Sequence, residues 1–294
     1  MKDSDKKSKQ SFIQELKNLL SETTKRENEL KEDNESLNRV INFQDANLNR
    51  EISEITDSYK EKLIKTRFEL ENMVKPGVTT LELDSYAENF ILDQGAVPAF
   101  KGLYGFPGTL CVSINDEVVH GVPSNRELIN GDIIGIDVGS IHQGFFGDHA
   151  KTFAVGSIDS NKEKLIDVTK ECLMKGISQA KPGNRIGDIG YAIQTHAESF
   201  GFGVVKDLVG HGIGEELHEE PQIPNYGEAK QGYKLRSGMC IAIEPMINSG
   251  SKDIFTASDG WTILTKDGLP SAHFEHTIAI TDQGPKVLSV GSDG

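Results

Sequence analysis

The chain has 294 residues, of which 36% are hydrophobic and 26% charged, and its formal net charge is -14. This composition is typical of a globular protein with a polar appendage, and the acidic charge argues against nucleic acid as the main partner. No apolar run approaches the roughly 20 residues of a membrane helix, and no secretory signal is visible, so we expect a cytoplasmic protein. Three widely spaced cysteines favour a reducing compartment over a disulfide framework: Cys111, Cys172 and Cys240.

Residues 1–74 differ in composition from the rest of the chain, because all 30 glycines and all 10 prolines follow Lys75. This first segment lacks the strongest helix breakers, and its apolar residues from Leu16 to Leu48 recur at alternating spacings of four and three. Polar residues interrupt this heptad pattern: Glu27, Asn34 and Gln44. We predict a helical N-terminal extension, and two forms of it remain open, a solvated arm or a coiled coil that self-associates or docks on a partner.

Residues 75–294 are rich in turns and contain a faint internal repeat. The tripeptide Lys-Pro-Gly occurs at 75–77 and again at 181–183, an offset of 106 residues, and each copy precedes a helical pattern. The apolar positions of these patterns are Leu83, Ala87, Phe90 and Ile91 in the first and Ile189, Ile193 and Phe200 in the second. The strand-like segments Ile134–Asp137 and Ile241–Glu244 repeat at an offset of 107. The shared order predicts two α+β halves that pack face to face around a central cleft.

Four carboxylates interrupt apolar, strand-like segments: Asp137, Asp148, Glu244 and Glu275. A buried, unpaired carboxylate costs several kcal/mol, so each of them needs a cation or a proton. Lys151 is close to Asp148 in sequence and offers a structural ion pair as the alternative for that acid. Asp137 and Asp148 are 11 residues apart with three glycines between them, which predicts a hairpin that brings both carboxylates together. Four acids in one repeated architecture favour a metal centre.

Histidine supplies the nitrogen donor that such a centre needs. His211 is the candidate ligand, because its neighbours Gly210, Gly212 and Gly214 allow close backbone approach, and His218 reaches the same site from a turn. Oxygen and imidazole donors suit Mn, Fe(II), Co or Zn better than a soft metal. His120 lies between a strand-like segment and a turn with glycine and proline, where a histidine often has only a structural role. No pattern marks the other five as functional: His142, His149, His196, His273 and His276.

Other chemistries find little support in the sequence. It contains no G-x-S-x-G nucleophile elbow, no H-E-x-x-H motif, no phosphate-binding loop and no G-x-G-x-x-G dinucleotide motif. Cys111 and Cys240 lie in apolar segments that are typical of unreactive core thiols.

Five blocks of the chain resemble type I methionine aminopeptidases: GFPGTLCVSINDEVVHGVP, GDIIGIDVGSIHQGFFGDHAKTFAVG, GHGIGEELHEEP, IAIEPM and DGWTILTKDGLPSAHFEHTIAIT. The blocks follow one another from about Lys75 to Ser289 with the order and spacing of that family. The resemblance implies the pita-bread fold, an α+β fold with two halves related by a pseudo-twofold axis. It also implies two divalent ions, Co, Mn, Fe(II) or Zn, and five ligands: Asp137, Asp148, His211, Glu244 and Glu275.

By the same resemblance, His120 and His218 contact the substrate, and a pocket formed by Phe106, Cys111 and Trp261 holds the methionine side chain. The implied reaction removes the initiator methionine from nascent polypeptides, free or at the ribosome, when the second residue is small. The two ions activate water and polarise the scissile carbonyl, and Glu244 moves the proton. His218 would donate a hydrogen bond to the carbonyl oxygen as its negative charge grows. One departure is Glu215, where the family commonly has a basic residue.

Two other functions are to be distinguished from this one. X-Pro aminopeptidases and prolidases share the five ligands but usually carry a longer N-terminal domain with its own α/β pattern, which residues 1–74 do not show. A binding protein that kept the fold and lost catalysis would lack metal ligands, and all five are present here.

Overall fold

The structure, a computed structural model, describes residue 26 and residues 69–289. Most of the predicted N-terminal extension, including its heptad pattern, therefore lies outside the described residues. Residues 69–73 are helical, and Leu70 is buried in the same hydrophobic core as the strands that follow. Within the described part, no helix is long and apolar enough to cross a membrane.

The first half of the fold combines α2 (Thr80–Asp93) with a sheet centred on β4 (Ile133–His142). Strand β5 (Phe145–Ala154) pairs along one edge of β4, and β1 (Val97–Pro98) and β2 (Leu110–Ile114) pair with the other. The helix begins with a capping box between Thr79 and Glu82. Three residues of the predicted helical pattern, Leu83, Ala87 and Ile91, are buried and pack on the sheet in one core, whereas the fourth, Phe90, is only partly buried.

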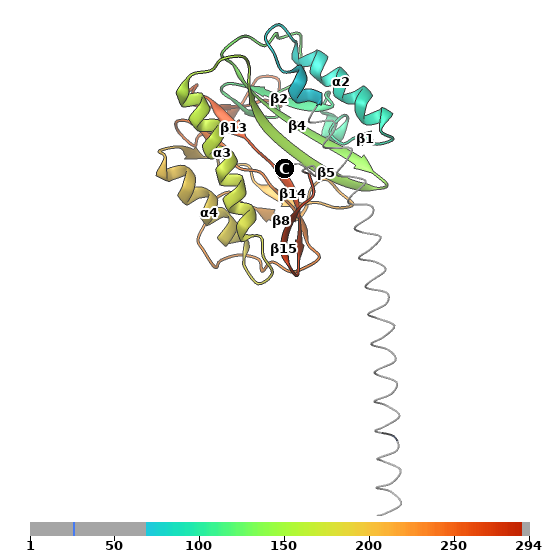
Figure 1. Ribbon diagram of the computed structural model, residues 1–294, viewed down its shortest axis with the longest axis vertical. Helices are drawn as coiled ribbons and strands as arrows, with labels where there is room; N and C mark the ends of the chain where they lie inside the picture. The colour runs from blue at the N-terminus through green and yellow to red at the C-terminus, as the bar shows by residue number, and fades with distance from the viewer. Residues whose placement is uncertain (1–25, 27–68, 290–294) are drawn as a thin grey trace, which may run out of the picture. The chain divides into compact units, whose positions relative to one another are not determined.

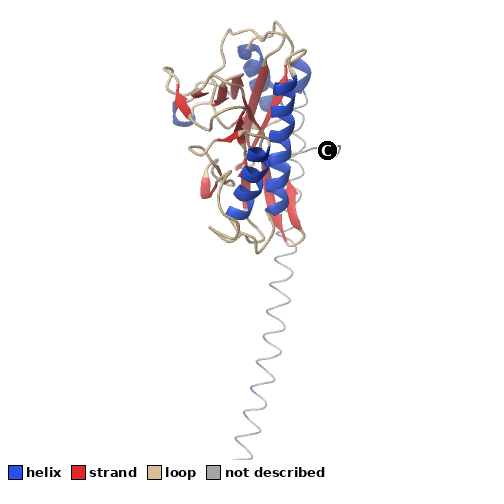
Figure 2. Cartoon of the chain, turned by 90° about the vertical axis from the view of Figure 1, so that its left-hand side faces the viewer, coloured by secondary structure: helices blue, strands red, loops and turns tan. Residues whose placement is uncertain are grey.

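The second half repeats this plan with two helices, α3 (Ser160–Gln179) and α4 (Ile186–Ser199). Its five-stranded sheet has the order β15 (Gly284–Val287), β14 (His276–Thr281), β9 (Cys240–Ile243), β7 (Gly210–Gly212) and β8 (Glu219–Ile223). The two helices lie side by side (Figure 2), and a Cβ at Gly176 would come within 2.8 Å of Ile193. Ile189 and Ile193 are fully buried, as predicted.

Phe200 is a correction to the predicted helical pattern. It caps the C-terminus of α4 and is 39% exposed, so it does not belong to the core face of that helix. The Lys164 ammonium lies 5.2 Å from the centre of its ring, which places Phe200 in a cation–π contact at the surface.

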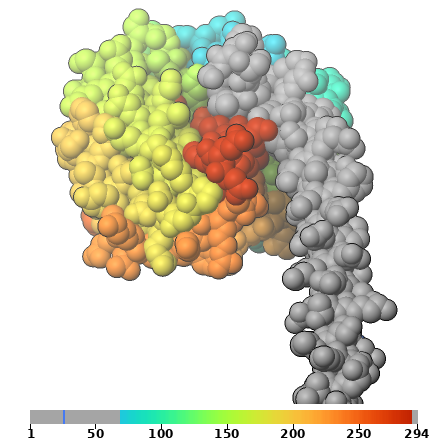
Figure 3. Space-filling view, turned by 60° about the horizontal axis from the view of Figure 1, so that its bottom comes forward, coloured from blue at the N-terminus to red at the C-terminus, as the bar shows by residue number. Residues whose placement is uncertain are grey.

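Two small three-stranded sheets complete the described fold. One has the order β13 (Ser271–His273), β10 (Met246–Asn248) and β6 (Gly203–Val204), and the other β11 (Ile254–Thr256), β12 (Ile263–Thr265) and β3 (Glu117–Val119). A short 3-10 turn, η1, spans Leu103–Gly105. Figure 1 shows the helices on the outside and the strands between them, and Figure 3 shows the surface of α3 beside the last described residues.

The two halves meet where β5 packs against β13 and β14. Thr152 Oγ1 donates to the carbonyl of His273 at 2.9 Å, and Thr277 Oγ1 donates to the carbonyl of Asp148 at 2.8 Å. The backbone N–H of Glu275 donates to the carbonyl of Ala150 at 2.9 Å. These bonds hold two of the predicted ligands, Asp148 and Glu275, next to each other. The α+β class and the two halves inferred from the internal repeat are confirmed.

Candidate metal centre and adjoining pocket

The strands β4 and β5 form the hairpin that the spacing of the two aspartates predicts. Its turn contains Gln143 and Gly144, both with positive φ, as tight hairpin turns require. In the register of the pair, Asp148 lies opposite Gly139 and Asp137 lies opposite Ala150. Residues two apart on a strand share a face, so both carboxylates project from the same face of neighbouring strands.

His211 lies in β7, between glycines that let the strand approach its neighbours closely. A Cβ at Gly210 would come within 2.4 Å of the carbonyl oxygen of Ala242, and one at Gly212 within 2.4 Å of that of Glu220. The Nδ1 atom of His211 lies 2.8 Å from the carbonyl oxygen of Gly212 and must donate its hydrogen there. Nε2 is therefore the ring nitrogen with a free lone pair, as a metal ligand needs.

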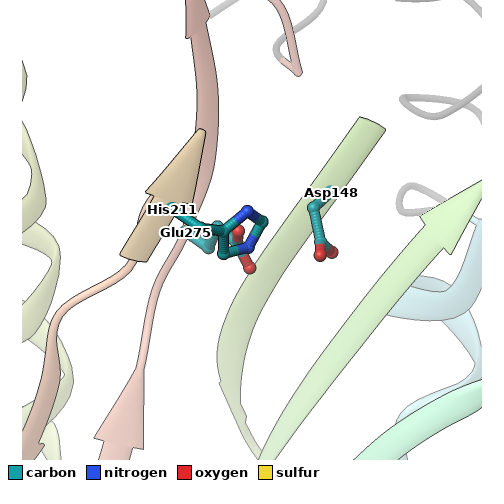
Figure 4. Close-up of side chains that lie close together, drawn as sticks. All are labelled: Asp148, His211 and Glu275. Atoms are coloured by element: carbon teal, nitrogen blue, oxygen red, sulfur yellow. The ribbon is translucent and has the colours of Figure 1, made fainter. Parts of the chain in front are cut away.

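Side chains from both halves converge at this point. Figure 4 shows Asp148 from β5, His211 from β7 and Glu275 from the link between β13 and β14, and their ligand atoms all lie within 4.8 Å of one another. Glu244 directly follows β9, and its Oε1 lies 3.5 Å from Nε2 of His211. Asp148 and Glu275 are buried, whereas Asp137 and Glu244 are partly buried at the wall of the cleft.

Burial acts strongly on these four acids. It raises the pKa of Asp137 and Glu275 well above the ordinary values, and the nearby charge of Asp148 adds to the rise for both. Burial likewise raises the pKa of Asp148, and it raises the pKa of Glu244 to about 8. Asp137 Oδ1 and Glu275 Oε1 have no hydrogen-bond partner within residues 69–289. Divalent cations would neutralise the acids and bind these oxygens, so the residues fit a metal centre.

Lys151 is not the partner of Asp148 that the sequence offered as an alternative. Its ammonium lies 3.0 Å from the carboxylate of Glu71, a residue 80 positions away. Within the described part of the chain, no ion pair joins a lysine or arginine to any of the four acids. The structural explanation for a buried Asp148 is therefore wrong.

A cleft of about 440 Å³ opens over the centre. Its lining includes every residue that the sequence analysis assigned to the site: Asp137, Asp148, His211, Glu244, Glu275, His120, His218, Phe106, Cys111 and Trp261. His120 follows β3 with φ of +59° and, like His218, has an exposed surface in the cleft. The rings of His218 and His211 meet edge to face, with centroids 4.6 Å apart.

The apolar end of the cleft adjoins the acids directly. In the pairing of β2 with β4, Cys111 lies opposite Asp137. Phe106 and Trp261 stand edge to face with ring centroids 5.2 Å apart, and Phe106 and Cys111 are buried. Asp259 accepts hydrogen bonds from the backbone N–H groups of Trp261 and Thr262, both at 2.9 Å, which fixes the turn that carries the indole.

The thiols have the unreactive character that their apolar segments predict. All three cysteines are free. Burial raises the pKa of Cys111 well above the ordinary value, with repulsion from Asp137 as the next cause, and it raises the pKa of Cys240 to about 12. Cys111 therefore contributes a small, neutral and polarisable wall to the pocket.

Several residues of the cleft were not predicted from the sequence: Phe100, Leu103, Tyr104, Leu208, Leu217 and Met246. Tyr104 is 80% exposed and has φ of +50° inside η1, between two glycines of positive φ. In the sequence, an apolar residue carries no signal that separates a pocket from a core, so only the folded chain identifies these residues.

His273 also gains significance from the structure. His273, Glu244 and Glu275 each offer a possible ligand atom, and these atoms all lie within 4.8 Å of one another. Burial lowers the pKa of the His273 imidazole to about 4, so the ring is neutral at pH 7. A signal existed in the sequence: His273 stands two residues before Glu275, on the same face of an extended segment.

Comparisons with known proteins agree with this geometry. The profile of metallopeptidase family M24 matches residues 48–282. Methionine aminopeptidase 1 of Bacillus subtilis is 52% identical over 224 residues, which are 76% of this chain and 90% of that protein. The crystal structure of methionine aminopeptidase from Rickettsia prowazekii has a TM-score of 0.80 at 41% identity, over 82% of this chain and 98% of that one. A prolidase from Pyrococcus furiosus, at 24% identity and a TM-score of 0.66, shares the fold over 82% of this chain and 64% of its own.

Proposed function

This chain belongs to the methionine aminopeptidases of metallopeptidase family M24, and from that membership and the lining of its cleft we infer that it removes N-terminal methionine from polypeptides. The fold is the pita-bread fold of that family, with the metal centre between its two α+β halves. One observation carries the inference: the acids, the histidines and the apolar pocket all line a single cleft.

The apolar pocket supports methionine as the residue that is removed. Phe106 and Trp261 offer two aromatic faces at which a thioether makes favourable contacts, and Cys111 adds a small, soft wall. Because Cys111 lies opposite Asp137, a side chain in the pocket holds its own carbonyl group near the acids. We expect the following residue to lie between His120 and His218, at a position that would accept only a small side chain.

Divalent metal dependence follows from the family, and we propose two ions with Asp137, Asp148, His211, Glu244 and Glu275 as their ligands. Four carboxylates balance the charge of two such ions, and the oxygen and imidazole donors accept Co, Mn, Fe(II) or Zn. When bound, the ions would lower the pKa of water and polarise the scissile carbonyl group.

The chain's own residues would divide the remaining work. Glu244 would take the proton of the attacking water and return it to the leaving amine, since its raised pKa suits both steps. His218 would donate a hydrogen bond to the carbonyl oxygen as negative charge develops there, and His120 would hold the peptide nitrogen. The free α-amine of the substrate would lie at the centre, which explains cleavage of the first residue only.

Nascent polypeptides are the substrates that this activity implies, and we propose that the protein meets them in the cytoplasm, free or at the ribosome. Its three free cysteines agree with a reducing compartment. We further propose that residues 75–294 form the catalytic domain and that residues 1–74 form a helical extension whose last turn packs on that domain through Leu70. As a coiled coil, the extension would let two chains associate.

The test compares substrates and metals in one assay. Purified protein is stripped of metal, reloaded with a single metal, and given Met-Ala-Ser or an Xaa-Pro peptide. We expect hydrolysis of Met-Ala-Ser alone. Cleavage of only the Xaa-Pro peptide would assign the chain the prolidase type of activity, and no cleavage of either peptide with any of the four metals would contradict an enzymatic function.

A further inference from the structure

Glu244 lies between two imidazoles, and the two contacts are nearly alike. Its Oε1 is 3.5 Å from Nε2 of His211, and its Oε2 is 3.6 Å from Nε2 of His273. Both distances are too long for a hydrogen bond. Two ligand atoms that each lie about 2.1 Å from one tetrahedral ion are about 3.4 Å apart, so each contact has the separation of two ligands of one cation.

The position of His273 fixes its ring in this arrangement. His273 pairs with Met246 in the β13–β10 register, and its backbone N–H donates to Thr152 Oγ1 at 2.9 Å. It shares a strand face with Glu275, two residues later, so both side chains point toward the centre. His273 is 3% exposed, and within the described part of the chain its Nε2 has no hydrogen-bond partner. A buried nitrogen without a partner is destabilising unless something binds it.

We propose that His273 is a metal ligand that binds a cation together with Glu244 Oε2 and Glu275. His211 would play the corresponding role on the other side of Glu244, together with Oε1. This inference rests on the proposed function, and it adds a sixth protein ligand to the five proposed there. A second imidazole makes the donor set richer in nitrogen. The centre should therefore favour Fe(II), Co or Zn over Mn more strongly than oxygen donors with one imidazole would.

Cobalt(II) is the probe for the test, because an imidazole bound to this paramagnetic ion shows a strongly shifted, exchangeable N–H proton in the NMR spectrum. The fully loaded wild-type protein should show two such signals. His211→Gln should remove one and His273→Gln the other. His196→Gln is the matched control and should keep both, since its ring contacts Glu171 and Phe200 on the helical surface.

Calorimetric titration with Co(II) gives a second readout that does not depend on activity. His273→Gln should weaken one binding step by about tenfold or more, and it should lower the preference for Co over Mn. The signal count in the wild-type protein needs no variant, so it decides the question even if a substituted chain fails to fold.

Two outcomes would overturn the proposal in different ways. A single shifted signal that His211→Gln removes and His273→Gln leaves, in a protein that hydrolyses Met-Ala-Ser, would overturn the ligand role of His273 and leave the proposed function intact. Absence of Co(II) binding together with absence of hydrolysis would overturn both.

Discussion

The two ends of the cleft touch each other but are built from opposite chemistry. At one end four acids and the His211 imidazole converge, and at the other two aromatic rings and a thiol enclose an apolar space. Cys111 and Asp137 mark the boundary, opposite each other in one strand pair. Charges in a poorly solvated site interact strongly, whereas a lost apolar wall costs only a few kcal/mol. The metal centre should therefore set the rate, and the pocket should set which residue is removed.

Removal of metal should have the largest effect. Chelation should abolish hydrolysis of Met-Ala-Ser, because without the metal no cation at the acids and His211 activates water or polarises the scissile carbonyl group. It should also lower the melting temperature, since an ion that binds only the folded chain stabilises it. The measurement is turnover and calorimetric melting before and after dialysis against chelator, with reloading as the control. Turnover that survives complete metal removal would contradict the proposed mechanism.

Glu244→Gln should come next, with turnover lower by orders of magnitude. The amide keeps the size of the side chain but loses a ligand charge and the ability to accept a proton. The matched control is Glu215→Gln, a change of an exposed acid outside the lining of the cleft, which should alter turnover far less. Equal losses in the two variants would show that general charge, and not the position of Glu244, determines the rate.

The acids also predict how the stability of metal-stripped protein depends on pH. Burial raises the pKa of Glu244 from 4.5 to about 8, so the folded state binds more protons than the unfolded state between these values. Stability of the stripped protein should therefore fall as pH rises from about 5 to 8, and loading with metal should remove most of this slope. Urea titrations at several pH values measure it. Stability that rises with pH in this range would contradict the burial of the acids.

The same contrast explains what the sequence made predictable. Asp137 and Glu244 were visible because a charge inside an apolar strand is costly and needs a reason. The role of Phe100 and Leu103 in the pocket could not be predicted, since the sequence around an apolar side chain is the same whether it lines a pocket or lies in a core. The partner of Lys151 was also out of reach, because Glu71 meets it only through the fold. Periodicity found α4, but Phe200, on the predicted rhythm, falls just past its end.

Trp261→Ala should affect selectivity and leave metal content unchanged. The loss of one aromatic wall is worth about 1–3 kcal/mol of discrimination at the first residue, or about ten- to two-hundredfold. The measurement is the ratio of kcat/KM for Met-Ala-Ser and Leu-Ala-Ser peptides. Phe255→Ala is the control, because this aromatic ring is exposed and does not line the cleft. Equal use of both peptides by the wild-type protein would mean that the pocket is wrongly assigned.

Truncation of the N-terminal segment should have the smallest effect on the cleft. The family match begins at residue 48, and every residue that lines the cleft follows it, starting with Phe100. A chain that starts at Leu48 keeps Leu70, which is 1% exposed in the first core, so it should fold and hydrolyse Met-Ala-Ser at the full rate. Light scattering then separates the two forms of the extension: a dimer that the truncation dissociates indicates a coiled coil, and a monomer in both indicates a solvated arm. A folded truncation with impaired hydrolysis would show that the segment acts on the catalytic domain. The rate of hydrolysis would then depend on the N-terminal segment as well as on the metal centre and the pocket.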